Sequence, residues 1–412
     1  MARRSVVFVG ALVAALALVG TAAAREIPGQ YIVVVKKEFS PRAVAADHSA
    51  RAGVDVLRTY RHALNGFSVR LSDAALARMR ADDRVLLVSA DHELRAGAQT
   101  LPTGIDRIQG DLSSTVSGNG SGSVNVAVAV LDTGIDLRHA DLNVVGGKNC
   151  STGKSYSDGN GHGTHVAGTI GAKDDANGVV GVAPGVPLYS VRVLNNQGSG
   201  SWSSVICGID WVTANAASRG IKVANMSLGG SGADGTCASS ALHQAICNSV
   251  NGARVTYVVA AGNSGANLGG FVPAAYDQVL AVTAVADFNG QPGGGAAPTC
   301  RSDVDETPAD FSNFAASADA AHTIAAPGVC ITSTWKGGGY NTISGTSMAS
   351  PHAAGTAALC IAGPCAGMTP SQVVSALRSG AAAQPASYGF SGDPNSPIGS
   401  RYYGYLAYAG GY

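Results

Sequence analysis

The sequence has few charged and few aromatic side chains for its length. Of its 412 residues, 13% are charged and 6% are aromatic, and the formal net charge is zero. Residues 25–95 carry a net charge of +3 and residues 96–412 one of −5, so no strongly basic surface is expected. A nucleic-acid partner is therefore excluded. Because 46% of the residues are hydrophobic, the chain can bury a large core, which excludes a disordered protein.

Long apolar runs are missing after the first residues of the chain. The one such run follows Arg3 and Arg4 and ends in Ala22-Ala23-Ala24, which is the pattern of a secretory signal peptide. A signal anchor is the alternative, since an apolar stretch of about 18 residues can span a bilayer. We expect residues 1–24 to direct the chain out of the cell or to a vacuole. After their removal, no contact with a membrane is expected.

Cysteine is absent from the first part of the chain, and no C-x-x-C pair occurs. The even number of cysteines, together with the signal peptide, indicates disulfides in an oxidising compartment. The competing interpretation is a structural zinc site, but the spacing of cysteine and histidine does not match the usual zinc motifs. Proximity along the chain favours three of the many possible pairings and leaves a fourth by elimination: Cys237–Cys247, Cys300–Cys330, Cys360–Cys365 and Cys150–Cys207.

Residues 31–90 show the order strand, helix, strand, strand, helix, strand. Apolar runs such as YIVVVK and GFSVRL alternate with helical stretches at 41–51 and 72–82, and Ser72 is a plausible N-cap of the second helix. This order predicts a small ferredoxin-like α+β domain. A domain of this size is only marginally stable alone and would gain from a partner surface.

From residue 124 onward, continuous apolar runs alternate with helical segments. Runs such as VNVAVAVLD and VLAVTAVA are typical of strands buried on both faces of a parallel sheet. Helices are expected at 201–219, 237–252, 346–362 and 369–380. The prediction is an α/β fold with an open, mainly parallel sheet and helices on both faces, its core about residues 125–380. Such sheets bind ligands beyond the carboxyl ends of their strands, where Asp132, Ser227 and Asn263 fall.

The stretch NTISGTSMASPHAAGTAAL places Ser347 at the start of an alanine-rich helix. Backbone N–H groups and the positive end of the helix dipole favour an anion beside this hydroxyl, although an ordinary helix cap is the alternative. A nucleophilic serine needs a base, and the base needs an acid that orients it. Asp132 ends the strand in AVLDTGID, and His162 begins a helix between two glycines in GHGTHVAGT. For either residue alone, a purely structural role is the competing interpretation.

Five motifs in this order, AVLDTGID, GHGTHVAGT, NMSLGG, VVAAGNSG and SGTSMASPHAAG, resemble those of the subtilisin-like serine peptidases of family S8. The resemblance covers roughly residues 98–380 and favours the proteinase K-like side of the family. It implies that Asp132 is the orienting acid, His162 the general base and acid, and Ser347 the nucleophile. The order Asp, His, Ser is the known order of subtilisin.

The same resemblance implies an oxyanion site and a substrate cleft. Asn263 would donate a side-chain N–H to the oxyanion, beside the backbone N–H of Ser347. The substrate would lie as an extended strand between Gly198-Ser199-Gly200 and Ser227-Leu228-Gly229. Trp202 would line the pocket for the fourth residue before the cut, with packing at the helix start as the alternative. The primary pocket would lie between Ser227-Leu228-Gly229 and Ala260-Ala261-Gly262, with Phe271 as part of its floor. No acidic residue occurs in these pocket segments, so apolar side chains are favoured over Lys or Arg.

A structural calcium ion is also implied by the resemblance. Its ligands would be the carboxylates of Asp141 and Asp175, the carbonyls of Lys173, Asn177 and Val179, and the side-chain oxygen of Gln99. Such a set of oxygens on flexible loops suits Ca²⁺ better than Mg²⁺, which keeps its waters and needs stricter geometry. Proteinase K departs from this loop, and a solvated acidic turn is the alternative.

Residues 25–97 resemble the inhibitory propeptide of type I9. The resemblance implies a zymogen whose propeptide assists folding and inhibits the enzyme, with cleavage in Arg95-Ala96-Gly97-Ala98 and a catalytic domain of residues 98–412. The mature enzyme is expected to be a monomer that acts on proteins and peptides. A lipase would carry G-x-S-x-G, which does not fit Ser347, and an inactive binding protein would lack a member of the triad.

Overall fold

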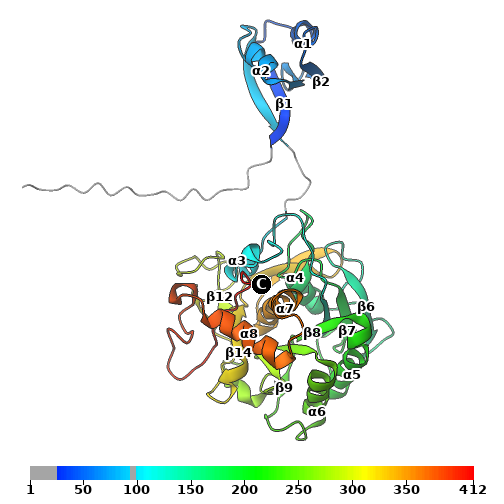
Figure 1. Cartoon of the computed structure of the whole chain (residues 1–412), viewed down its shortest axis with the longest axis vertical. Coiled ribbons are helices and arrows are strands. Elements are labelled where there is room, and N and C mark those ends of the chain that lie inside the picture. Colours follow the sequence, from blue (N-terminus) through cyan, green and yellow to red (C-terminus); the bar gives the residue numbers. More distant parts are fainter. Residues whose placement is uncertain (1–25, 93–98) are drawn as a thin grey trace, which may run out of the picture. The chain divides into compact units, whose positions relative to one another are not determined.

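The computed structural model describes residues 26–92 and 99–412 (Figure 1). The chain divides into two compact units, with the division between Ala96 and Gly97. The expected signal peptide and the expected cleavage segment lie outside the described residues. Within the described ranges, no helix is both long and apolar enough to cross a membrane.

The first unit is a four-stranded antiparallel sheet with two helices. Its elements are β1 (Glu26–Val35), α1 (Pro41–Ser49), β2 (Val54–Tyr60), β3 (Gly66–Leu71), α2 (Asp73–Arg80) and β4 (Val85–His92). The strand order β2-β3-β1-β4 places the first strand between the third and the fourth. Ser72 caps α2, because its hydroxyl accepts the N–H of Ala75. Phe67 and Met79 are fully buried between sheet and helices, so the predicted α+β order is confirmed.

The second unit is built on an eight-stranded, mainly parallel sheet. Its strands are β5 (Ala127–Asp132), β6 (Val144–Asn149), β7 (Leu188–Arg192), β8 (Ile221–Met226), β10 (Thr256–Ala260), β12 (Val279–Ala286), β13 (Thr307–Pro308) and β14 (Thr323–Pro327). They run in the order β13-β12-β10-β8-β5-β7-β6, and β14 also pairs with β12. Only the short strand β13 is antiparallel to its neighbour.

Helices cover both faces of this sheet, as the buried apolar strands predict (Figure 1). They are α3 (Thr103–Arg107), α4 (His162–Gly171), α5 (Trp202–Arg219), α6 (Ala241–Asn248), α7 (Thr346–Ala362) and α8 (Pro370–Ala382), with short helical turns η1 (Gly110–Leu112), η2 (Ser249–Ala253), η3 (Leu268–Gly270), η4 (Asp319–His322) and η5 (Ala386–Tyr388). Successive β5 residues point to opposite faces. Val130 joins the core under α4, α7 and α8, and Leu131 joins the core under α5 and α6.

Two small antiparallel strand pairs lie outside the main sheet. β9 (Gly230–Ser231) pairs with β11 (Phe271–Val272), and β15 (Ile331–Trp335) pairs with β16 (Gly339–Ile343). The helix predicted at 237–252 is shorter than expected. The hydroxyl of Ser240 caps α6 by accepting the N–H of His243, so the helix begins at Ala241, and its last part becomes the π-helical turn η2.

All eight cysteines form disulfides, so no free thiol is left for a zinc ion. The four pairs are Cys150–Cys207, Cys237–Cys247, Cys300–Cys330 and Cys360–Cys365, which are the pairs that chain proximity and elimination favour.

The tyrosine-rich end of the chain lies along β14. The N–H of Ala325 donates to the carbonyl of Tyr405, and the N–H of Ala407 donates back to the carbonyl of Ala325. The Tyr412 hydroxyl donates to the Ala376 carbonyl on α8 at 3.1 Å. This segment therefore covers an edge that would otherwise expose unpaired backbone groups.

Candidate active site

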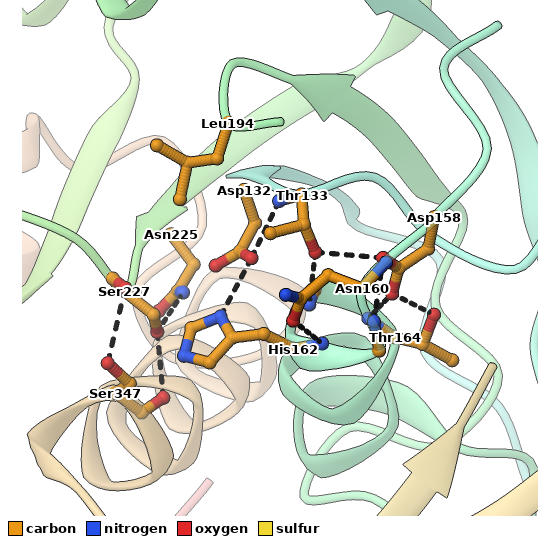
Figure 2. Close-up of polar contacts among 12 residues, drawn as sticks. Asp132, Thr133, Asp158, Asn160, His162, Thr164, Leu194, Asn225, Ser227 and Ser347 are labelled. Atoms are coloured by element: carbon orange, nitrogen blue, oxygen red, sulfur yellow. Dashed lines mark hydrogen bonds and ion pairs between the residues drawn. The ribbon is translucent and has the colours of Figure 1, made fainter. Parts of the chain in front are cut away.

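The polar residues expected beyond the strand ends meet at one edge of the sheet. β8 lies between β5 and β10, so the carboxyl ends of these three parallel strands are neighbours. Asp132 is the last residue of β5, Ser227 follows β8, and Asn263 follows β10. At the same edge, α4 begins with His162, and Ser347 is the second residue of α7 (Figure 2).

Asp132 and His162 form a hydrogen-bonded pair. Asp132 Oδ1 lies 2.8 Å from His162 Nδ1 and also accepts the N–H of Thr133 at 2.7 Å. The Asp132 side chain is fully buried, whereas that of His162 is 25% exposed. Because an ionised carboxylate only accepts hydrogen bonds, the pair places a proton on Nδ1 and leaves Nε2 free to act as a base. Burial lowers the pKa of His162, but the charge and the hydrogen bond of Asp132, together with the charge of Asp158, outweigh it and raise this pKa above its ordinary value.

The turn before His162 is shaped by Asp158, which the sequence did not single out. Its carboxylate accepts hydrogen bonds from the hydroxyls of Thr133 and Thr164 and from the backbone N–H groups of Asn160, Gly161 and Thr164. Asn160 Oδ1 in turn accepts the backbone N–H of His162 at 3.1 Å. The glycines of Asp158-Gly159-Asn160-Gly161 are the turn signal that would have pointed to this role.

Ser347 is held by reciprocal hydrogen bonds with Ser227. Its hydroxyl donates to the Ser227 carbonyl at 3.2 Å, and the Ser227 hydroxyl donates to the Ser347 carbonyl at 2.8 Å. The buried side chains of Asn225 and Ser350 extend this network. The imidazole of His162 lies between the Asp132 carboxylate and Ser347 (Figure 2). The serine hydroxyl is thus turned toward Ser227 and not hydrogen-bonded to the imidazole.

Two N–H donors border one small space beside Gly345. Asn263 Oδ1 accepts both the N–H and the hydroxyl of Thr346 at 2.8 Å, so the amide nitrogen faces away from Thr346. A Cβ placed on Gly345 would lie 3.6 Å from Asn263 Nδ2 and 3.6 Å from the backbone N of Ser347. Both nitrogen atoms therefore lie near the same point next to the serine.

A cleft of about 690 Å³ opens beside His162 and Ser227. Its lining includes seven residues that the sequence predicted: Gly198, Ser199, Gly200, Trp202, Ser227, Leu228 and Gly229. It also includes Thr133, Asn160 and Leu194, which the sequence did not predict. Trp202 is 38% exposed and packs against Gly230, so its ring serves both the cleft and the helix start.

Phe271 lies behind the cleft and is not part of its lining. A Cβ on Gly229 would approach an atom of its ring to 2.3 Å, and one on Gly262 would approach the ring to 3.0 Å. The ring therefore stands between the two segments that were expected to enclose the primary pocket, and both positions need glycine.

The residues predicted to bind calcium lie close together around Gln99, except that Asp175 lies at the exposed edge of this group. Gln99 Nε2 donates to the carbonyls of Lys173, Asn177 and Val179 at 2.7, 3.1 and 3.1 Å. Asp141 Oδ2 accepts the N–H of Val179 at 3.0 Å and the hydroxyl of Tyr340 at 3.3 Å. Asp175 is exposed, and its carboxylate accepts the N–H of Asn177 at 3.1 Å.

This loop leaves buried oxygens without donors. Gln99 Oε1 and Asp141 Oδ1 are buried and have no hydrogen-bond partner. Burial raises the pKa of Asp141 to about 6, and the charge of Asp175 adds to that rise. Once the Gln99 amide is turned so that Oε1 replaces Nε2 beside the three carbonyls, the set of carbonyl, amide and carboxylate oxygens fits a hard cation such as Ca²⁺.

His165, the other histidine of α4, is structural. Its Nε2 lies 2.9 Å from the carbonyl of Ile331, and the side chain is fully buried. Burial lowers the pKa of His165 to about 3, so it stays neutral and serves packing.

Comparison with known proteins agrees with this geometry. The model of the subtilase family (peptidase S8) matches residues 123–405, and that of peptidase inhibitor I9 matches residues 30–96. The chain is 40% identical to the extracellular serine proteinase of Thermus sp. (strain Rt41A), with 87% of this chain and 86% of that protein covered. It is 44% identical to subtilisin DY of Bacillus licheniformis over 64% of this chain and 85% of that protein.

A solved structure extends the match to the fold. The crystal structure of a cold-adapted subtilisin-like serine proteinase aligns with a TM-score of 0.57 at 33% identity, covering 75% of this chain and 98% of that one. The chain therefore belongs to the subtilase family and is a serine-type endopeptidase that carries an N-terminal I9 inhibitor domain.

Proposed function

We propose that this subtilase is secreted and cleaves peptide bonds through Asp132, His162 and Ser347 by way of an acyl-enzyme. The observation that carries the proposal is the 2.8 Å contact between Asp132 Oδ1 and His162 Nδ1, which leaves Nε2 free on the side of Ser347 (Figure 2). On substrate binding, the Ser347 hydroxyl turns from Ser227 to Nε2, since catalytic hydrogen bonds often form only in the complex.

The steps follow from these positions. His162 Nε2 takes the proton of Ser347 as its Oγ attacks the carbonyl carbon of the substrate. The negative charge of Asp132 stabilises the imidazolium, which then gives the proton to the leaving amine. Water, activated by the same imidazole, releases the acyl group from the serine. The side-chain N–H of Asn263 and the backbone N–H of Ser347 stabilise the oxyanion in both halves of the reaction.

For the substrate, we propose an extended strand between residues 198–200 and 227–229. Backbone hydrogen bonds along these segments would bind peptides of many sequences, which suits a broad specificity. Phe271 would form the floor of the primary pocket, and Trp202 would contact the fourth residue before the cut. The absence of acidic residues from 227–229 and 260–262 favours apolar side chains before the cut.

We further propose that the chain is a self-processing zymogen and that the mature enzyme is a monomer. Residues 1–24 would be the signal peptide, 25–97 the propeptide and 98–412 the catalytic domain. The propeptide would act as folding assistant and inhibitor, and its net charge of +3 against −5 for the remainder favours their association. The relative from Thermus is named as extracellular, which favours export over a vacuolar destination.

A calcium ion would be held by Gln99, Asp141 and the loop 173–179. Its ligands would be the Gln99 and Asp141 side chains, the carbonyls of Lys173, Asn177 and Val179, and the carboxylate of Asp175. Bound there, the ion would supply positive charge to two carboxylates. The segment that starts at Gln99 already pairs with this loop, because the N–H of Thr100 donates to the Gly178 carbonyl at 2.7 Å. The ion would thus stabilise the contact between the start of the catalytic domain and the loop 173–179.

Covalent labelling tests the proposal. Diisopropyl fluorophosphate should modify the mature enzyme once, and peptide mapping should place the adduct on Ser347. Ser347→Ala should give a folded, secreted precursor that is neither labelled nor processed, because the hydroxyl supplies chemistry and little packing. An adduct on another serine would refute the nucleophile, and maturation of the variant to normal size without another protease would refute self-processing.

A further inference from the structure

Arg192 is a buried cation beneath the rim of the cleft. It is the last residue of β7, in register with Asp132 on β5, and it is only 7% exposed. Among the residues that the structure describes, no carboxylate forms an ion pair with its guanidinium. A buried charge without a counter-ion is costly unless its hydrogen-bonding groups are satisfied, so its partners matter.

The partners of Arg192 are neutral oxygens on two separate loops. Nη1 donates to the carbonyls of Ser155 and Ser157 at 3.1 and 3.5 Å, Nη2 donates to Asn196 Oδ1 at 2.8 Å, and Nε donates to the carbonyl of Leu194 at 3.3 Å. Residues 155–157 lead into the Asp158 turn and His162, whereas residues 194–196 lead into the cleft rim at 198–200. The planar guanidinium thus ties the histidine side of the cleft to the substrate side.

Asn160 links the same two sides of the cleft. Its Nδ2 donates to the Asn196 carbonyl at 2.9 Å, and its Oδ1 accepts the backbone N–H of His162. Within the rim, Asn195 Oδ1 accepts the N–H groups of Gln197 and Ser199, and these bonds fix the shape of the loop but not its place beside His162. The base of the loop is held by backbone N–H groups of residues 193 and 194, which donate to the Asp132 carbonyl. The exposed rim at 196–200 is linked to the histidine side by the side chains of Arg192, Asn196 and Asn160.

We propose that Arg192 is a positioning residue, which sets the distance between His162 and the rim at 198–200. This inference rests on the proposed function, because it assumes that the substrate lies in the proposed cleft. It adds the residue that positions the rim of that cleft. If the rim is displaced, a peptide that pairs with it loses backbone hydrogen bonds that it makes equally in the ground state and in the transition state, so it binds more weakly. A reagent that needs only Ser347 and His162 does not depend on the rim. Lysine cannot replace arginine here, because a single ammonium group cannot reach acceptors on both loops in a fixed plane.

The experiment compares the wild type with Arg192→Lys and Asn196→Ala, all as mature enzymes. Peptide p-nitroanilides with one and with four residues before the cut are hydrolysed, and labelling by diisopropyl fluorophosphate is timed. Arg378→Lys is the matched control, because that guanidinium also donates to backbone carbonyls, those of Ala320 and Thr323, away from the cleft.

We expect Arg192→Lys to raise KM for the four-residue substrate about tenfold, with kcat and the labelling rate within about twofold of the wild type. Asn196→Ala, which removes one bond from an exposed loop and leaves the fold intact, should raise KM in the same direction by about threefold. The control should change none of these values.

Three outcomes overturn the inference. An unchanged KM in both variants would show that Arg192 does not position the rim. An equal loss of activity on both substrates and of labelling rate would show a general structural effect. If the wild type gains nothing from the additional three residues, the proposed cleft itself is wrong. In the first outcome, the wild type and both variants bind the longer substrate more tightly than the short one, so only the role of Arg192 is wrong.

Discussion

Asp132 and Asp141 are two buried aspartates, close in the sequence, with different surroundings. In each, one carboxylate oxygen receives two hydrogen bonds and the other has no partner. Asp132 has His162 beside it, a group that can carry a positive charge. Asp141 has only neutral donors and lies close enough to Asp175 for that charge to help raise the pKa of Asp141 to about 6.

Because Asp132 and Asp141 are both buried, they differ mainly in the charged group that lies beside each of them. The charge of Asp132 is used within the chain, where it raises the pKa of His162 and holds the imidazole in one tautomer. Within the described part of the chain, the Asp141 carboxylate forms no ion pair, so a proton or an added cation is the group that can neutralise it. This contrast supports the proposal that one aspartate serves catalysis and the other an ion.

The largest expected effect is that of Asp132→Asn. The amide keeps the shape but cannot hold the imidazole in the productive tautomer, so kcat should fall about 10⁴-fold, as it does in a related triad. Peptide hydrolysis near pH 8 measures this fall, and the calcium dependence of thermal unfolding should stay unchanged. Asp141→Asn is the matched control and should keep kcat within a few-fold when assayed well below its melting temperature. Equal loss in both variants would erase the distinction between the two aspartates.

A smaller effect on activity is expected for Asn263→Leu, because leucine is similar in size to asparagine but has no side-chain N–H to donate. Loss of one oxyanion donor in subtilisin costs about 10²- to 10³-fold in kcat, and a similar loss is expected here with little change in KM. Steady-state kinetics on a peptide substrate distinguish the two constants. A rise in KM at constant kcat would instead assign Asn263 to ground-state binding.

The smallest effect on activity, but the clearest on stability, is expected for Asp141→Asn. If calcium binds only the folded state, it stabilises the wild type by about 2.7 kcal/mol at a hundredfold excess of free ion over Kd. The variant should lose most of this gain. Thermal unfolding of both proteins with chelator and with calcium is the measurement, and identical melting of the wild type under both conditions would remove the ion site.

Local patterns were enough to predict the sheet and to place Asp132 and Ser347 at its edge, whereas the roles of these residues come from the resemblance and stay predictions. The apolar run before Asp132 and the alanine-rich helix after Ser347 each signal burial within a few residues, and the flanking glycines signal close approach. Where a local signal competed with another, the prediction failed in detail. The cap formed by Ser240 starts α6 later than its apolar pattern indicates.

Long-range polar contacts explain what the sequence could not predict. Arg192 donates hydrogen bonds to Ser155 and Asn196, and nothing in the periodicity of a buried strand distinguishes such an arginine from a surface residue. The terminal tyrosines likewise had no assigned role, because their partner is the edge of β14, far away in the sequence. Only the assembled sheet shows which edge they cover.

The most direct test of the central claim is the pH dependence of Ser347 labelling by diisopropyl fluorophosphate in the wild type and in Asp132→Asn. Labelling needs neutral His162, so its rate should fall as the pH drops through the pKa of that residue, which the Asp132 charge raises above the ordinary 6.5. In the variant, burial remains as the largest influence on the His162 pKa and only the weaker charge of Asp158 opposes it, so labelling should be slower and its inflection should move below 6.5. Identical rates and inflections in both proteins would show that Asp132 does not act through His162, and would contradict the proposed triad.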